Sequence, residues 1–407
     1  MVISYPKNRI KVLLLENIHP YAYKLLKAEG YSVETYKGSL NEDELCHKIQ
    51  DVTILGIRSK TLISPRVLQQ AKNLIVIGAF CIGVNQIELT EATKKGIGVF
   101  NAPYSNTRSV VELVLGEIIM LLRNVIGKNN NLHQGIWDKS AINSYEVRGK
   151  KLGIIGYGNI GSQLSVLAEA LGMRVYYYDI SEKLQLGNAR KCDTLQELLK
   201  VVDIITLHVD GRESNTNLIG ESEFAIMKDK VIFLNLSRGH VVDLEALVRN
   251  LKNGRLLGAA IDVFPYEPKS NNEEFITELR QLPNVILTPH IGGSTEEAQY
   301  NIGDFVARQI INYVNLGDST QSVNLPNIQL PELKNAHRLV HLHENVPGIL
   351  AQINQVLARN NINVLGQYLK TNEHVGYVIT DINAQYNKDV INELRQIEHT
   401  IRTVVLY

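Results

Sequence analysis

The chain has 407 residues, of which 44% are hydrophobic and 21% charged, a composition typical of a soluble protein with two or three domains. Basic and acidic side chains balance at 42 each, which argues against the strong positive field of a nucleic-acid-binding or membrane-surface protein. No stretch approaches the roughly 18 apolar residues of a membrane helix, and the apolar run at the N-terminus is too short for a signal peptide, so we expect a cytoplasmic protein.

The first part of the chain alternates short apolar strands with helical segments, the pattern of a parallel α/β lobe. A long, largely apolar helix is expected over 106–123, as for a buried element that joins two lobes. Another helical segment begins near residue 292 and would return the chain to the first lobe. Residues 295–316 would then complete this lobe, which is made mainly of residues 1–105. The expected strands of this lobe are 11–15, 52–57, 74–79 and 98–101.

Residues 151–179 carry the most specific pattern of the chain. An apolar strand runs into Gly156-Tyr157-Gly158-Asn159-Ile160-Gly161, a helix follows, and a second apolar strand ends on Asp179. Gly156 permits a tight turn, Gly158 lets a pyrophosphate approach the backbone, and Gly161 lets the helix pack on the sheet. The helix N-terminus attracts phosphate groups, and Asp179 suits the ribose hydroxyls of NAD but repels the 2′-phosphate of NADP. The pattern predicts an NAD site; the alternative is a glycine-rich turn without a ligand.

The alternation of strands and helices continues to residue 294 and then changes. We expect residues 106–294 to form the dinucleotide-binding domain, and residues 317–335, which lack periodicity, to form a linker. Residues 336–407 follow the order β-α-β-β-α-β of a ferredoxin-like unit. The sequence therefore predicts two Rossmann-like, doubly wound α/β lobes and a small ferredoxin-like domain. The further strands expected in the second lobe are 203–209, 231–236, 257–263 and 285–287.

Three chemically useful side chains, Arg238, Glu267 and His290, follow strands of the second lobe. Ligands of open α/β sheets bind at the carboxyl ends of the strands. A histidine can take the proton of a hydroxyl group while hydride leaves the adjacent carbon, and a carboxylate can orient the ring and raise its pKa. An arginine can hold a carboxylate in fork geometry. Together they predict hydride transfer on a 2-hydroxy acid, although each residue alone also has a purely structural interpretation.

Four motifs, GYGNIG, NLSRGHVVD, AAIDVFPYEP and TPHIGGS, occur in this order. In order and spacing the chain resembles the D-isomer-specific 2-hydroxyacid dehydrogenase family over residues 10–316. The resemblance implies that His290 is the acid/base, Glu267 its partner and Arg238 the substrate-binding arginine. It also implies an NAD site lined by Gly156, Gly158, Asn159, Ile160, Gly161, Asp179, His208, Leu236, Ser237, Arg238, Asp262, His290, Ile291, Gly292 and Gly293.

A basic segment of the first lobe suits a substrate with two anionic groups. Arg58-Ser59-Lys60 follows the strand 52–57, at a strand end expected to face a cleft. The segments CIGVNQIEL and NAPYSNTRSVVE also resemble the substrate side of the family. The candidates for binding a substrate carboxylate and phosphate are Arg58, Ser59 and Asn106, with Lys37 and Lys139 as weaker ones.

The C-terminal unit, with HLHENVPGIL, resembles an ACT amino-acid-binding domain. Asn345 leads into a helix whose free N–H groups could receive an amino-acid carboxylate. By resemblance, two such domains pair through their sheet edges and bind L-serine with His343, Asn345 and Asn363; the alternative is a dimerisation module whose asparagines cap helices.

Trp137 lies in a polar loop, where a single aromatic residue more often anchors an interface than binds a ligand. We expect a homo-oligomer, a tetramer by resemblance.

The combined resemblance implies one activity above others. This is the NAD-dependent oxidation of 3-phospho-D-glycerate to 3-phosphooxypyruvate, the first step of L-serine biosynthesis, with feedback inhibition by serine. Alternatives are a reductase for another 2-oxo acid (2-oxoglutarate, glyoxylate or hydroxypyruvate) and, less favoured, a non-catalytic NAD(H)-sensing protein. The cysteines, Cys46, Cys81 and Cys192, lack metal-ligand spacing, so no metal is expected, and no nucleic-acid or membrane partner.

Overall fold

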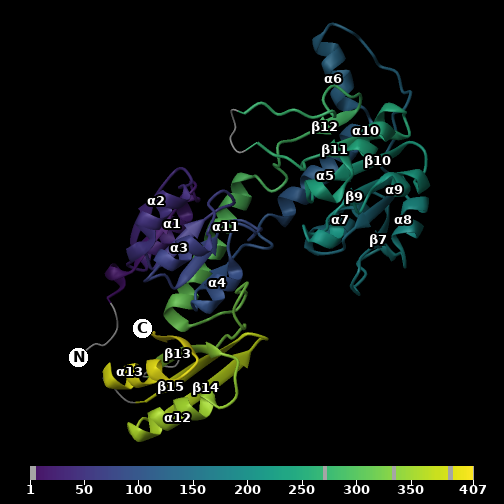
Figure 1. Ribbon diagram of the computed structural model, residues 1–407. Helices are drawn as coiled ribbons and strands as arrows, with labels where there is room; N and C mark the ends of the chain where they lie inside the picture. The colour runs from purple at the N-terminus through teal and green to yellow at the C-terminus, as the bar shows by residue number, and fades with distance from the viewer. Residues whose placement is uncertain (1–5, 269–272, 332–335, 384–387, 407) are drawn as a thin grey trace. The chain divides into compact units, whose positions relative to one another are not determined.

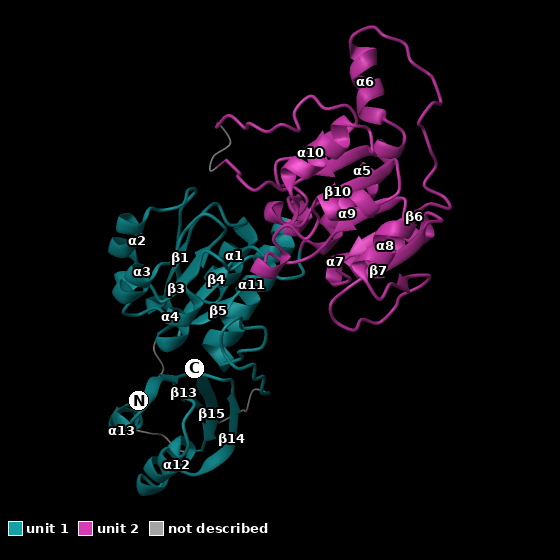
Figure 2. Ribbon diagram, turned by 45° about the vertical axis from the view of Figure 1, so that its right-hand side comes forward, with its two compact units in different colours: residues 1–105, 299–407 teal, residues 106–298 magenta. Residues whose placement is uncertain are grey.

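The computed structural model describes residues 6–268, 273–331, 336–383 and 388–406 (Figure 1). By contacts between residues, the chain divides into two compact units (Figure 2). Residues up to 105 and residues from 299 onward form the first unit, and residues 106–298 form the second. The last four residues of the expected linker, 332–335, lie outside the described residues.

The first unit begins with a parallel sheet that has, in the described residues, five strands in the order β2-β1-β3-β4-β5. The order reverses beside β1, as in a doubly wound fold. Helices α1 and α11 cover one face and α2, α3 and α4 the other, so every residue of β3 and β4 is buried. The elements are β1 (Lys11–Leu14), α1 (Pro20–Ala28), β2 (Ser32–Thr35), α2 (Glu42–Lys48), β3 (Ile54–Ile57), α3 (Pro65–Gln70), β4 (Val76–Ala79), α4 (Leu89–Lys94), β5 (Gly98–Phe100) and α11 (Glu296–Leu316).

The second unit contains a parallel sheet whose described strands follow the order β12-β11-β10-β9-β6-β7-β8. This is the Rossmann order with an added strand, and it reverses between β9 and β6. Helices α5 and α7 pack on one face and α8, α9 and α10 on the other. The elements are α5 (Thr107–Leu122), α6 (Val125–His133), β6 (Lys151–Ile155), α7 (Asn159–Ala170), β7 (Arg174–Tyr178), β8 (Arg190–Lys191), α8 (Leu195–Val201), β9 (Ile204–Leu207), α9 (Glu221–Ile226), β10 (Val231–Asn235), α10 (Leu244–Lys252), β11 (Leu256–Ile261) and β12 (Val285–Leu287).

The C-terminal part of the first unit is an antiparallel sheet in the order β14-β15-β13-β16. Helices α12 and α13 cover one face of this sheet. Val340, Leu342 and Tyr377 on its other face share a hydrophobic core with Tyr313 of α11. The elements are β13 (His337–Glu344), α12 (Ile349–Arg359), β14 (Val364–Thr371), β15 (Val375–Ile382), α13 (Lys388–Gln396) and β16 (Thr400–Val405).

The predicted fold class is confirmed: both doubly wound lobes and the ferredoxin-like unit are present. Two strands were not predicted. The edge strand β2 exposes three of its four residues and therefore lacks an apolar run, and β8 has only two residues. Within the described part of the chain, no helix is long and apolar enough to cross a membrane.

One carboxylic acid lies inside the core of the second unit. Glu117 of α5 is 0% exposed, and neither of its side-chain oxygens has a hydrogen-bond partner among the described residues. Burial, with a smaller contribution from the charge of Asp262, raises the pKa of Glu117 to about 8. The group is therefore neutral in the folded chain at pH 7 and ionised in the unfolded chain.

We predict that Glu117→Gln stabilises the second unit. Because the folded pKa lies above the unfolded value of 4.5, the destabilisation by Glu117 is absent below pH 4.5, grows as the pH rises, and levels off above about 8. Thermal denaturation should show equal Tm values for variant and wild type near pH 4.5 and a Tm higher by on the order of 10 °C in the variant at pH 8. Glu112→Gln, an exposed change on the same helix, is the control. A pH-independent difference would contradict the prediction.

Candidate active site

The turn after β6 has the geometry of a dinucleotide-binding loop. Gly156 has φ +92°, and a Cβ atom there would lie 2.5 Å from the carbonyl oxygen of His208. At Gly161 a Cβ would overlap the carbonyl oxygen of Gly156, whereas at Gly158 it would meet no described atom within 4 Å. The first and third glycines are thus required for packing, and the second leaves open space where a pyrophosphate can approach.

Two further features of this loop fit NAD. Helix α7 begins directly after Gly158 without a side-chain cap among the described residues, so its first N–H groups remain available for phosphate. Asp179, at the end of β7, accepts hydrogen bonds from Tyr157 N at 2.8 Å and from Ser181 N and Oγ at 2.9 Å each. Burial opposes its ionisation, but these hydrogen bonds outweigh burial and lower the pKa of Asp179, which keeps it anionic, as the predicted contact with ribose hydroxyls requires.

The strand order reverses between β6 and β9, where ligands of such sheets bind. His208, directly after β9, has a buried Nδ1 atom without a hydrogen-bond partner among the described residues, while its Nε2 lies 3.0 Å from Thr206 Oγ1. Burial lowers the pKa of His208 to about 3, so its ring is neutral. Leu236 and Ser237, which follow β10, are buried.

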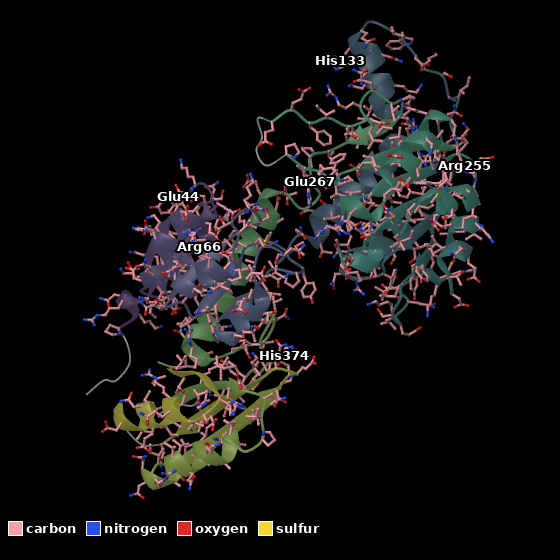
Figure 3. All side chains as sticks on the ribbon, viewed as in Figure 1. Glu44, Arg66, His133, Arg255, Glu267 and His374 are labelled. Atoms are coloured by element: carbon pink, nitrogen blue, oxygen red, sulfur yellow. The ribbon has the colours of Figure 1, made fainter. Side chains whose placement is uncertain are left out.

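His290 and Glu267 form a pair at the ends of β12 and β11. His290 Nδ1 lies 2.8 Å from Glu267 Oε2, and Glu267 Oε1 accepts from Phe264 N at 3.1 Å. Figure 3 labels Glu267 on the segment that follows β11. The hydrogen bond to Glu267 raises the pKa of His290 against the opposing effect of burial. Burial disfavours the Glu267 anion, but the hydrogen bond and charge of His290 outweigh it and lower the pKa of Glu267. The pair can hold and release a proton.

Arg238 lies close enough to this pair for its charge to affect the pKa values of both partners. Its Nη1 donates to the carbonyl oxygen of Ser237 at 2.7 Å, and its side chain is half-buried. The next residue, Gly239, packs so tightly against the backbone of Phe264 that a Cβ atom would overlap it. This contact holds the loop of Arg238 against the segment that leads to Glu267.

The substrate candidates of the first unit lie on two loops at the carboxyl ends of β2 and β3. Arg58 and Ser59 follow β3, and the exposed Lys37 follows β2. Sequence reasoning missed the group that holds the Arg58 loop. The carboxylate of Glu16, only 7% exposed, accepts hydrogen bonds from the backbone N–H groups of Arg58 at 3.1 Å, Lys60 at 3.0 Å and Thr61 at 2.9 Å. An acidic residue directly after an apolar strand was the available signal.

The remaining substrate candidates belong to the second unit and lie apart from each other along the chain. Asn106 directly precedes α5, and its side chain packs against Gly293, where it fills the space of a Cβ atom. Its buried Oδ1 has no hydrogen-bond partner among the described residues. The exposed Lys139 lies on the segment after α6, which also carries Trp137.

The three residues expected to bind serine do not meet within one chain. His343 is buried near the end of β13, and its Nε2 has no hydrogen-bond partner among the described residues. Asn345 donates from Nδ2 to the carbonyl oxygen of Asn372, just past the end of β14. Asn363 directly precedes β14. The first residue of β14 pairs with Ile382 of β15, and its last residue pairs with Gly376 of β15. Asn345 and Asn363 therefore lie at opposite ends of the sheet.

Two family models match the chain. Residues 115–292 match the D-isomer specific 2-hydroxyacid dehydrogenase, NAD binding domain, and residues 339–402 match an AHAS small subunit-like ACT domain. The second unit thus carries an NAD-binding domain.

Curated relatives match the full length of the chain. The D-3-phosphoglycerate dehydrogenase of Haemophilus influenzae is 51% identical over 406 residues, covering 100% of this chain and 99% of its own, and that of Escherichia coli is 47% identical over 408 residues, covering 100% and 99%. D-3-phosphoglycerate dehydrogenase 1 of Saccharomyces cerevisiae is 47% identical over 413 residues, covering 98% of this chain and 88% of its own.

Solved structures share the fold of both lobes. D-2-hydroxyisocaproate dehydrogenase aligns with a TM-score of 0.70 at 26% identity, covering 77% of this chain and 99% of its own. D-lactate dehydrogenase from Aquifex aeolicus, complexed with NAD and lactic acid, aligns with a TM-score of 0.65 at 26% identity, covering 74% and 95%. The chain belongs to the D-isomer specific 2-hydroxyacid dehydrogenase family and carries a C-terminal ACT domain.

Proposed function

We propose that the chain is an NAD-dependent dehydrogenase that oxidises 3-phospho-D-glycerate to 3-phosphooxypyruvate and is inhibited by L-serine. The observation that carries the proposal is the His290–Glu267 pair, 2.8 Å apart, in the same unit as the NAD-binding turn. The full-length similarity to phosphoglycerate dehydrogenases supports the substrate, and the matched ACT domain supports an amino-acid effector.

The proposed roles follow from the chemistry of each group. The turn of Gly156 and Gly158 and the carboxylate of Asp179 would hold NAD, which would supply the acceptor for the hydride of the substrate's carbinol carbon. Neutral His290 takes the hydroxyl proton on Nε2, because Nδ1 is held by Glu267, and the Glu267 anion stabilises the resulting imidazolium. Arg238 would bind the substrate carboxylate and polarise the forming carbonyl group.

An NADH-linked assay with 3-phosphooxypyruvate, 2-oxoglutarate, glyoxylate and hydroxypyruvate, each with and without L-serine, tests the proposal. The phosphorylated substrate should give the highest kcat/KM, and serine should reduce its turnover. His290→Gln should lower kcat by about 10²- to 10⁴-fold while leaving NADH binding intact. Tight NADH binding without turnover of any acid in the panel would contradict the proposal.

We predict that Glu267→Gln shifts the pH dependence of the reaction. Oxidation needs neutral His290, so kcat/KM rises as the pH passes the pKa of His290. Because Glu267 raises that pKa, removing its charge should move the rising limb to lower pH and reduce kcat. The measurement is kcat/KM for 3-phosphoglycerate between pH 5 and pH 10. Glu274→Gln, at an exposed surface carboxylate, is the control, and an unmoved limb in Glu267→Gln would argue against the assigned pair.

Arg58 is proposed to bind the substrate phosphate, in the loop that Glu16 holds. Arg58→Ala should therefore weaken binding of 3-phosphoglycerate more than binding of an unphosphorylated D-2-hydroxy acid. Equal effects on both substrates would assign the phosphate to another group.

We predict that Glu16→Gln raises the KM for 3-phosphoglycerate by about tenfold with little change in kcat, the loss expected for one charge-assisted hydrogen bond. The amide cannot accept all three backbone N–H groups equally well, so the loop loses its fixed position. Steady-state kinetics measure the effect, with Glu88→Gln, at an exposed carboxylate of the same unit, as control. A fall in kcat at unchanged KM would place the effect elsewhere.

The chain is proposed to act as a homo-oligomer with two interfaces, a tetramer. The segment from α6 to residue 145 exposes many apolar side chains, including Trp137 at 78%, and α6 extends from the rest of its unit (Figure 2). The edge strand β14 exposes Leu365, Tyr368 and Leu369. Exposed apolar patches and unpaired strand edges favour association with another chain.

Pairing through β14 would also complete the serine site. The eight residues of β14 span roughly 25 Å, which separates Asn363 from Asn345 in one chain. If two β14 strands run antiparallel, Asn363 of one copy comes beside Asn345 and His343 of the other.

We predict that hybrids of Asn345→Ala and Asn363→Ala chains regain serine inhibition. Each variant alone should lose it, because both of its sites are defective. A mixed pair has one site with both asparagines and one with neither, so about half of the sites return. Co-expression with two different tags, purification of the hybrid and serine titration of the NADH-linked assay measure this. Hybrids as insensitive as either parent would mean that the site lies within one chain.

A further inference from the structure

The peptide backbone of Arg58 is held from two directions. Its N–H group donates to the Glu16 carboxylate at 3.1 Å, and its carbonyl oxygen accepts a hydrogen bond from Gln86 Nε2 at 2.7 Å. Glu16 precedes Arg58 by 42 residues and Gln86 follows it by 28, so neither contact is part of a local turn. Two side chains distant in sequence therefore fix the backbone from which the Arg58 side chain extends.

The loop that carries Gln86 is joined to the loop of Arg58 by backbone pairing. Gln86 lies between β4 and α4, and its carbonyl oxygen accepts a hydrogen bond from Ile63 N at 2.8 Å. Glu88 N donates in turn to the carbonyl oxygen of Ile63 at 3.1 Å, so that Ile63 and Ile87 form a short parallel bridge. Both isoleucines are buried. The bridge keeps the Gln86 side chain within reach of Arg58.

The amide of Gln86 has weaker alternatives to its contact with Arg58. Its Nε2 atom lies 3.3 Å from the carbonyl oxygen of Gly83 and 3.4 Å from Cys81 Sγ, both longer than the 2.7 Å to the carbonyl oxygen of Arg58. A side-chain amide nitrogen can donate twice, once to Arg58 and once to Gly83 or the weakly accepting sulfur. Gln86 thus links the loops that follow β3 and β4, at the edge where ligands of such sheets bind.

The side chain of Arg58 suits an anion. The residue is half-buried, and its hydrogen bonds to other described residues are made by its backbone and none by its guanidinium group. A guanidinium group presents its N–H donors in a planar fork that matches the oxygen atoms of a phosphate group. A fixed backbone with unused donors is the arrangement of a preorganised anion site.

We propose that Gln86 is a positioning residue for Arg58 and thereby determines the preference for a phosphorylated substrate. The inference rests on the proposed binding of the substrate phosphate by Arg58. A guanidinium group that shifts with its backbone loses its fork geometry toward the phosphate. Arg238 and His290, which act at the carbinol carbon in the proposed reaction, belong to the second unit. Loss of the Gln86 amide should therefore weaken phosphate binding and leave the chemical step almost unchanged.

3-Phosphooxypyruvate and hydroxypyruvate test this selectivity in the NADH-linked assay, because they differ only in the phosphate group. Gln86→Met removes the amide at nearly constant length. It should raise the KM for 3-phosphooxypyruvate on the order of tenfold, the effect of one lost hydrogen bond, and change kcat by less than about twofold. The KM for hydroxypyruvate should stay within about twofold of wild type. Gln69→Met, an exposed change on α3, is the control.

A double-mutant cycle separates positioning from a general structural effect. If Gln86 acts through Arg58, Gln86→Met should add less than about twofold to the rise in KM that Arg58→Ala already causes. Independent effects of the two substitutions would multiply instead. Circular dichroism establishes that the variants are folded, and an unchanged Kd for NADH, measured by its fluorescence, establishes that the second unit is intact.

The outcomes separate this inference from the proposed function. Equal losses for both 2-oxo acids in Gln86→Met, a multiplied loss in the double variant, or an unchanged KM for 3-phosphooxypyruvate would each overturn the positioning role. If wild type turns over no 2-oxo acid, the proposed function fails, and calorimetry with inorganic phosphate still decides the role of Gln86. Gln86→Met and Arg58→Ala should then both weaken phosphate binding, and wild-type affinity in Gln86→Met would overturn the inference.

Discussion

The left-handed conformation of His290 is the constraint on which the site depends. From this backbone geometry the ring of His290 meets Glu267, and the two residues follow the neighbouring parallel strands β12 and β11. The contact between Gly239 and the Phe264 backbone adds the third strand end, so the loops after β10, β11 and β12 are fixed against one another. The ends of three neighbouring strands therefore determine where the side chains of Arg238, Glu267 and His290 lie.

Buried carboxylates serve two different purposes in this chain. Glu16 and Asp262 each follow an apolar strand and each accept three hydrogen bonds from a neighbouring loop, so their burial is compensated. Glu117 has no such donors among the described residues, and its pKa rises instead. The contrast shows how the number of donors decides whether a buried acid orders a loop or remains a neutral, destabilising group.

Much of the fold could be predicted from the sequence because buried parallel strands are continuous apolar runs. The NAD-binding turn could be predicted because its glycines, Gly156 to Gly161, lie within six residues of each other. What could not be predicted depends on contacts distant in sequence. Glu16 reaches Arg58 across 42 residues and Thr288 reaches Asp262 across 26, and no local pattern encodes either hydrogen bond. The edge strand β2 was missed for a related reason, since its pairing with β1 rather than its own hydrophobicity makes it a strand.

The chain passes between its two units at residues 105–106 and again at 298–299. Within the second unit, Ser109 Oγ and Thr295 Oγ1 lie 2.8 Å apart, and Asn106 presses on Gly293, three residues after His290. Both ends of the second unit therefore lie next to the segment 288–293, which donates hydrogen bonds to Asp262. The ACT sheet shares its core with α11, which is itself the continuation of the second passage. A ligand of the ACT domain that shifts α11 would therefore act on the segment next to His290 without a separate path through the protein.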